Sequence, residues 1–110
     1  MLELEGHTVA LVHQFEWSDG PGAFDHSDPE GHLEYLCGHF MGGATGEIIV
    51  FGDSHYERVE QFGPVLLVNP GSPTFPRNMS PRLGHIGFLT LERGEPPHAE
   101  IRHLSEWTVA

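Results

Sequence analysis

Residues 48–55 read Ile-Ile-Val-Phe-Gly-Asp-Ser-His, and this stretch decides the fold. Its first four residues are apolar and mostly β-branched, which is typical of a buried strand. Because the run has no polar alternation, it predicts a parallel strand that is covered on both faces. We expect Gly52 to make a sharp turn with positive φ, from which Asp53 and His55 project. Ligands of α/β proteins bind beyond such strand ends, so this turn is the first candidate site.

A second apolar run, residues 65–68, ends in a similar polar turn, Asn-Pro-Gly-Ser-Pro at residues 69–73, with Arg77 close behind. Asn, Pro, Gly and Ser are residues that satisfy or fix the backbone of tight turns, so we interpret this turn as architectural. Arg77 is interpreted as the partner of a surface carboxylate, with a phosphate clamp as the alternative. Two strand ends that carry polar turns predict one shared site.

One helix is predicted, at residues 29–41. Asp28 followed by Pro29 is typical of an N-cap with proline in the first turn, and Gly42-Gly43 supplies the end. Apolar residues recur between them at helical spacing, and Cys37, the single cysteine, is expected to be one of the buried positions.

The remaining pattern predicts strands at residues 8–12, 47–51, 58–62, 65–69, 85–92 and 99–104. The first ends at His13, the strands after His55 are expected to be antiparallel neighbours, and the run at 86–91 is apolar enough for an interior strand. The fold class is therefore α/β, a mixed β-sheet with one main helix. One helix covers only part of one sheet face, so we expect another chain or further sequence to cover the rest.

Length and charge narrow the possible functions. The 110 residues fit one domain or part of one, and they contain no apolar stretch that could span a membrane and no signal peptide, so a cytoplasmic location is expected. Five basic residues against 16 acidic ones give a net charge of -11, which argues against nucleic acid as the main partner. An anionic substrate would need bound cations to reverse the sign of the pocket.

Three residues are candidate metal ligands, namely Asp53, His55 and His13. Carboxylate oxygen and neutral imidazole nitrogen suit divalent Mn, Zn, Fe or Ni. The structural alternative is that Asp53 caps its turn and that the two histidines bond to the backbone.

The segments Ile-Val-Phe-Gly-Asp-Ser-His and Leu-Leu-Val-Asn-Pro-Gly-Ser-Pro-Thr, followed by Pro-Arg, resemble the C-terminal half of a calcineurin-like metallophosphoesterase of the compact bacterial and archaeal phosphodiesterase branch. The resemblance covers about residues 2–104 and is most specific over 48–77. It implies the C-terminal half of a four-layer αββα sandwich. His55 stands in the second histidine position of the family's Gly-His-Thr/Ser-His motif, Asp53 stands at the first, and His13 stands in an earlier His-Gly motif, with Gln14 in place of the glycine.

The family's ordered series of Asp-x-His, Gly-Asp and Gly-Asn-His/Cys-Asp motifs does not occur in the 110 residues, whose single Asp-x-His and single Gly-Asp both lie within residues 52–55. The resemblance thus implies that residues 1–110 are a single partial domain that contributes His13, Asp53 and His55 to a two-metal site and is inactive alone. The implied reaction is metal-dependent hydrolysis of a phosphate ester, in particular a phosphodiester. Manganese is the expected metal, with Zn, Fe, Ni or Mg as alternatives. The expected partners are a small phosphate ester and either an N-terminal half-domain or a second copy of the chain.

Two other interpretations remain open. The same fold could serve as a non-catalytic protein-interaction scaffold, which exposed apolar sheet surface and degenerate ligand motifs would favour. A small cupin-like barrel is suggested by Pro70-Gly71, by the many histidines and by the abundance of strands, although the chain has no His-x-His pair.

Overall fold

The computed structural model describes residues 1–15, 27–72 and 84–104. In these ranges the elements, in chain order, are β1 (Leu2–Leu4), β2 (His7–Leu11), α1 (Pro29–Met41), β3 (Ile48–Val50), β4 (Glu57–Phe62), β5 (Val65–Pro70), β6 (His85–Thr90) and β7 (His98–His103). Across the part of the chain so described, no helix has the length and apolar character needed to cross a bilayer.

Five strands form the main sheet, in the order β1-β2-β3-β5-β4. The three inner strands β2, β3 and β5 run parallel, and β1 and β4 pair antiparallel at the two edges. β2, α1 and β3 make a strand-helix-strand unit with parallel strands. The mixed sheet with one helix agrees with the fold class expected from the sequence.

The helix begins and ends where the sequence predicts. The Asp28 carboxylate accepts a hydrogen bond from the Gly31 backbone N–H at 3.2 Å, and Pro29 occupies the first turn. At the other end Gly42 adopts the left-handed conformation with φ of 64°, and the Gly43 N–H donates to the Cys37 carbonyl at 3.0 Å. Cys37 is buried, as predicted.

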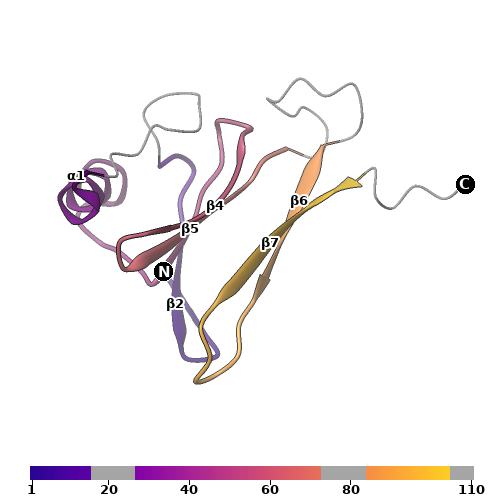
Figure 1. The fold of residues 1–110 in the computed structure, drawn as a ribbon. Coiled ribbons are helices and arrows are strands. Elements are labelled where there is room, and N and C mark those ends of the chain that lie inside the picture. Colours follow the sequence, from indigo (N-terminus) through magenta and orange to yellow (C-terminus); the bar gives the residue numbers. More distant parts are fainter. Residues whose placement is uncertain (16–26, 73–83, 105–110) are drawn as a thin grey trace, which may run out of the picture.

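The two faces of the main sheet are covered by different layers, and Figure 1 shows α1 on one side of the sheet and β6 and β7 on the other. Ile49 and Leu67 point to the helix side, where they pack with Leu36 and Phe15. On the opposite side a second apolar cluster joins the main sheet to the two-stranded sheet formed by β6 and β7. Its members are Val9, Ile48, Leu66 and Val68, with Val50, Leu89, Leu91 and Ala99 packed against them.

The sheets differ from the expectations in four respects. β6 is not an interior strand of the main sheet but pairs only with β7, and Phe88 in its middle is exposed. The second face of the main sheet is covered in part by this two-stranded sheet, and therefore by the chain itself. The edge strand β1 was not predicted, because all three of its residues are exposed and give no buried pattern. The main sheet is open, with edges at β1 and β4, so the barrel interpretation is also wrong.

The connection between β4 and β5 is tight, as the Gly63-Pro64 pair predicts. Phe62 pairs with Val65, which leaves two residues in the turn, and Gly63 has φ of 57°. Glycine adopts this left-handed conformation without the clash of a Cβ atom.

We predict that Leu67→Ala lowers the free energy of unfolding by about 2–5 kcal/mol, because it leaves a cavity in the helix-side core. The Leu67 side chain has an exposed fraction of 0%. Urea unfolding followed by circular dichroism gives the measurement. Val59→Ala, at a position that is 40% exposed on β4, is the matched control and should cost less than about 1 kcal/mol. Equal losses for the two variants would contradict the assigned core.

Candidate metal centre

The carboxyl ends of β2, β3 and β5 lie at one edge of the main sheet because the three strands are parallel. His13 follows β2, the turn 52–55 follows β3, and Gly71-Ser72 follows β5. Backbone hydrogen bonds continue past the strand ends, since the Val12 N–H donates to the Val50 carbonyl at 2.9 Å and the Gly52 N–H to the His13 carbonyl at 3.1 Å. These bonds hold the first two strand ends side by side.

His13 and Asp53 converge at this edge. The distance from His13 Nε2 to Asp53 Oδ1 is 3.1 Å, which places a nitrogen and an oxygen donor within reach of one ion. The side chains are 86% and 44% exposed, so water and ions have free access to both. An exposed pair of this kind contributes little to stability, which leaves it available for another role.

His55 lies in the same turn as Asp53, with an intermediate exposure. It does not complete a three-ligand set. Among residues 1–15, 27–72 and 84–104, no group of three His, Cys, Asp or Glu side chains is placed to hold a metal ion. The structure thus brings two of the three predicted ligands into contact and places the third two residues away along the chain. Arg77 falls outside the described residues.

The turn is strained at the candidate ligands. Asp53 has φ of 73° and His55 has φ of 66°, whereas Gly52, at which we expected the positive φ, does not have one. The left-handed region costs an L-residue with a Cβ atom about 1–2 kcal/mol. Asp and His are among the residues that tolerate it best. Such strain persists only where the surroundings impose it, and it concentrates at functional sites.

A buried hydrogen bond ties this turn to the next one. The Asn69 side-chain amide donates to the Ser54 hydroxyl at 3.0 Å, and the Ser54 hydroxyl also accepts from the Tyr56 N–H at 3.3 Å. Asn69 Oδ1 accepts from the Gly71 N–H at 3.0 Å, and Asn69 is fully buried. The two strand-end turns therefore form one unit. Asn69 is architectural, as interpreted from the sequence, but the role of Ser54 was missed because it depends on a partner 15 residues away.

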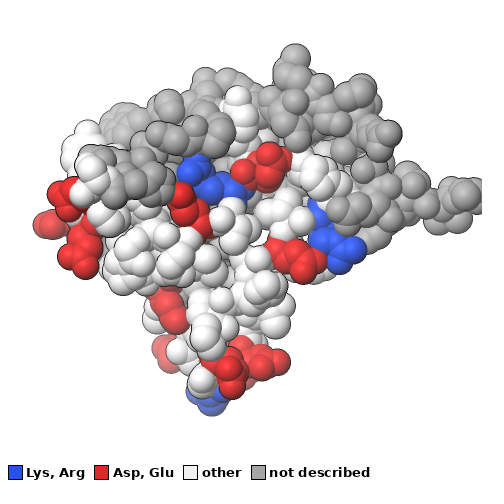
Figure 2. Space-filling model, in the orientation of Figure 1, with Lys and Arg blue, Asp and Glu red and all other residues white. Residues whose placement is uncertain are grey.

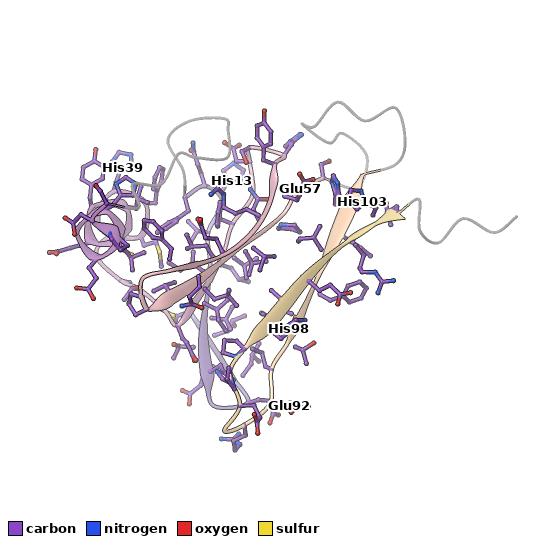
Figure 3. All side chains as sticks on the ribbon, in the orientation of Figure 1. His13, His39, Glu57, Glu92, His98 and His103 are labelled. Atoms are coloured by element: carbon purple, nitrogen blue, oxygen red, sulfur yellow. The ribbon has the colours of Figure 1, made fainter. Side chains whose placement is uncertain are left out.

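Two histidines extend this edge of the molecule toward β6 and β7. His85 Nε2 lies 2.7 Å from Glu57 Oε2, and the rings of His85 and His103 lie 4.3 Å apart, nearly perpendicular. In Figure 3 His13, Glu57 and His103 all lie toward the same end of the two sheets. No local sequence pattern could have identified this group, since the antiparallel register of β6 and β7 pairs His85 with His103.

The sequence of residues 1–94 matches the family model of the calcineurin-like phosphoesterase superfamily domain. The chain belongs to this superfamily. No curated protein and no solved structure gives a significant match. The superfamily's fold is that of a metal-dependent phosphoesterase, and the converging nitrogen and oxygen donors of His13 and Asp53 are of the type that such sites use.

The spacing of the two donor atoms is close to that of neighbouring ligands in a metal site. Two adjacent ligands of an octahedral ion, each at roughly 2.0–2.2 Å from the metal, lie about 3 Å apart. The observed 3.1 Å between His13 and Asp53 fits this spacing. A nitrogen and an oxygen donor at this spacing could be neighbouring ligands of one divalent ion.

The surroundings of this site are rich in paired charges. The Arg58 guanidinium lies 3.1 Å from Glu60, and that of Arg102 lies 3.0 Å from Glu100. Figure 2 shows blue atoms adjoining red ones on this face. On the described surface each of these two guanidinium groups is engaged by a carboxylate.

Backbone strain at His55 gives a prediction that is specific to this turn. His55→Gly should be more stable than His55→Ala by about 1 kcal/mol, because only alanine carries a Cβ atom into the left-handed conformation. The control is the exposed helical residue His39, where the order should reverse and glycine should be less stable than alanine by about 1 kcal/mol. Chemical unfolding of the four variants measures both differences. If alanine is the more stable residue at both positions, the strained turn is incorrect.

Proposed function

We propose that this chain supplies part of the metal centre of a phosphoesterase, with His13, Asp53 and His55 as ligands of divalent ions. The observation that carries the proposal is the 3.1 Å contact between His13 and Asp53 at the ends of two parallel strands, in a member of the calcineurin-like phosphoesterase superfamily. Manganese is the metal that we favour, with Zn, Fe, Ni or Mg as alternatives.

The side chains of the site would have two roles, to bind the metal ion and to hold the turn that carries the ligands. In the metal-free pair, the imidazole N–H of His13 donates to the Asp53 carboxylate. Both side chains are donors to a metal once that proton leaves, so a divalent ion would take the proton's place and its binding would release protons. The hydrogen bond from Asn69 to Ser54 and the strain at Asp53 and His55 fix the turn before any ion arrives. When bound, such ions polarise a phosphoryl oxygen and lower the pKa of water.

We further propose that the centre is shared with another polypeptide segment. A two-metal site clamps the attacking and leaving oxygens of phosphoryl transfer and needs more than the three ligands named here. The missing donors would come from a segment with the superfamily's Asp-x-His, Gly-Asp and Gly-Asn-His/Cys-Asp motifs, either as an N-terminal half-domain or through self-association. In this proposal residues 1–110 are a partial domain, inactive alone, and the assembled site hydrolyses a phosphate ester, in particular a phosphodiester, in the cytoplasm.

The scaffold interpretation keeps one observation in its favour. Three leucines are 44% to 64% exposed on the β1–β2 end of the main sheet, namely Leu2, Leu4 and Leu11. Exposed apolar side chains on neighbouring strands are typical of a surface that another protein covers. Metal binding distinguishes the two functions, because a scaffold has no need of His13 and Asp53 as ligands.

Titration of the chain with Mn²⁺ by isothermal calorimetry tests the ligands. His13→Ala and Asp53→Asn should each weaken binding by about tenfold or more, since each removes one donor atom from an already small set. His98→Ala is the matched control, because His98 is an exposed histidine on β7 at a distance from the site, and its affinity should equal that of the wild type. Identical affinities for all four proteins would show that the ions bind elsewhere and would favour the scaffold.

Reconstitution tests the shared centre. We expect no hydrolysis of a chromogenic phosphodiester by the chain with Mn²⁺, and activity when a separately expressed segment with the three missing motifs is added. His55→Ala should reduce the activity of the mixture by at least about a hundredfold if His55 is a ligand. Activity of the chain alone would contradict the partial site, and a mixture unaffected by His55→Ala would remove His55 from the ligand set.

A further inference from the structure

The two-stranded sheet β6–β7 is fastened to the main sheet at both ends by a buried histidine. His85 at the start of β6 contacts Glu57 of β4 near the metal edge. At the opposite end, His7 of β2 contacts Glu47, which immediately precedes β3, and the carbonyl of Glu92, which follows β6. Figure 3 shows Glu92 far from Glu57 and His103. The apolar cluster of Val9, Ile48 and Leu89 lies between the two sheets.

His7 makes a hydrogen bond with each of its ring nitrogens. Nδ1 lies 2.8 Å from Glu47 Oε2, and Nε2 lies 2.9 Å from the Glu92 carbonyl oxygen. A carboxylate and a carbonyl are both acceptors, so both ring nitrogens must carry a proton for both bonds to form. The ring in this arrangement is therefore the imidazolium cation. His7 is only 6% exposed, so water cannot easily replace a lost bond.

The neighbouring charges favour this cation. The hydrogen bond to the Glu92 carbonyl, followed by the hydrogen bond and the charge of Glu47, raises the pKa of His7 above its ordinary value, while burial opposes the shift. The backbone of Glu95 acts in the same direction. Glu5 lies two residues before His7 in the β1–β2 turn, and Arg93 lies against Gly6, where its positive charge opposes the imidazolium.

We propose that His7 is a proton-dependent latch, which holds the β6–β7 sheet against the main sheet while its ring is charged and releases that end when the ring becomes neutral. A neutral ring has one N–H donor and one unprotonated nitrogen, which is an acceptor. One of the two oxygen acceptors, the Glu47 carboxylate or the Glu92 carbonyl, then faces that unprotonated nitrogen and loses its hydrogen bond. This inference does not rest on the proposed metal chemistry, since His7 contacts the Glu92 carbonyl, and Glu92 lies at the opposite end of the two sheets from His13 and Glu57.

The direction of the pH dependence follows from the raised pKa. The latch contributes its full stability below the unfolded-state value of about 6.5 and loses it as the pH rises through the higher value of the folded state. The β6–β7 end at Glu92 should therefore open on the alkaline side. Histidine residues that change charge in this range serve as pH sensors in many proteins.

The experiment combines two NMR measurements on the full chain. The first is the titration of the His7 ring, and the second is the protection of the β6–β7 amides against hydrogen exchange from pH 6 to 9, corrected for the intrinsic rate. The variants are Glu47→Gln, which keeps an acceptor oxygen but removes the charge, His7→Gln, and the control His98→Gln on the exposed side of β7.

In the wild type we expect His7 to titrate above its ordinary value and amide protection near Glu92 to fall by about tenfold across that titration. Glu47→Gln should move both transitions to lower pH, His7→Gln should abolish the pH dependence, and His98→Gln should match the wild type. If His7→Gln does not fold, Glu47→Gln alone carries the comparison. A wild-type His7 that titrates at its ordinary value, or protection that stays constant across its titration, would overturn the latch.

Discussion

The parallel pairing of β2, β3 and β5 is the constraint on which the rest of the structure depends. β3 lies at its centre, and the side chains of its first two residues point to opposite faces. Ile49 packs under the helix and Ile48 packs under the β6–β7 sheet, and both are fully buried. One short strand thus joins the two outer layers. Because its neighbours run in the same direction, the turn after it meets the residues that follow β2 and β5, and these turns make the candidate site.

Local patterns predicted the elements whose causes are local. Asp28, Pro29 and Gly42 fix the ends of the helix by capping and backbone conformation, and the structure has the helix at the predicted residues. The prediction of an interior strand at β6 was wrong because its residues alternate between two faces. One face, with Leu89, packs on the main sheet, and the other, with Phe88, is exposed. Six mostly apolar residues look like an interior strand whether or not both faces are covered, so periodicity could not place β6 in a second sheet.

The site, like the fold, was predicted from the sequence only where its causes are local. Strand-end chemistry identified Asp53 and His13, which the structure brings into contact, because parallel strands place their ends together. The contribution of Ser54 and the pairs His7–Glu47 and His85–Glu57 depend on registers between distant strands, which composition and spacing do not contain. The positive φ was assigned to glycine on propensity alone. In the structure Asp53 and His55 have the positive φ instead.

Histidines contact carboxylates at several places in the described part of this acidic chain. The sequence has five arginines and no lysine against 16 carboxylates, and three described histidines each contact one carboxylate. His7 and His13 differ in how far each ring is exposed to solvent, and this difference decides how easily a metal ion could replace the ring proton. The ring of His7 is buried and its proton is held by two acceptors, so a metal ion would have to lose its own hydration to replace that proton. His13 is exposed and shares its proton with a single carboxylate, which makes replacement by a hydrated ion much easier.

The positive φ at Asp53 and His55 can be explained either by the packing of the turn or by a function of the two side chains. Glycine would adopt both backbone conformations without the cost of about 1–2 kcal/mol that a Cβ atom brings to each. The chain does contain glycine at other left-handed positions, such as Gly63 and Gly71, where no side chain is required. Packing does not explain the difference at Asp53, which is exposed and whose carboxylate contacts the imidazole of His13. The strained and accessible position of Asp53, beside a second metal-type donor, supports the ligand role that we propose for its carboxylate.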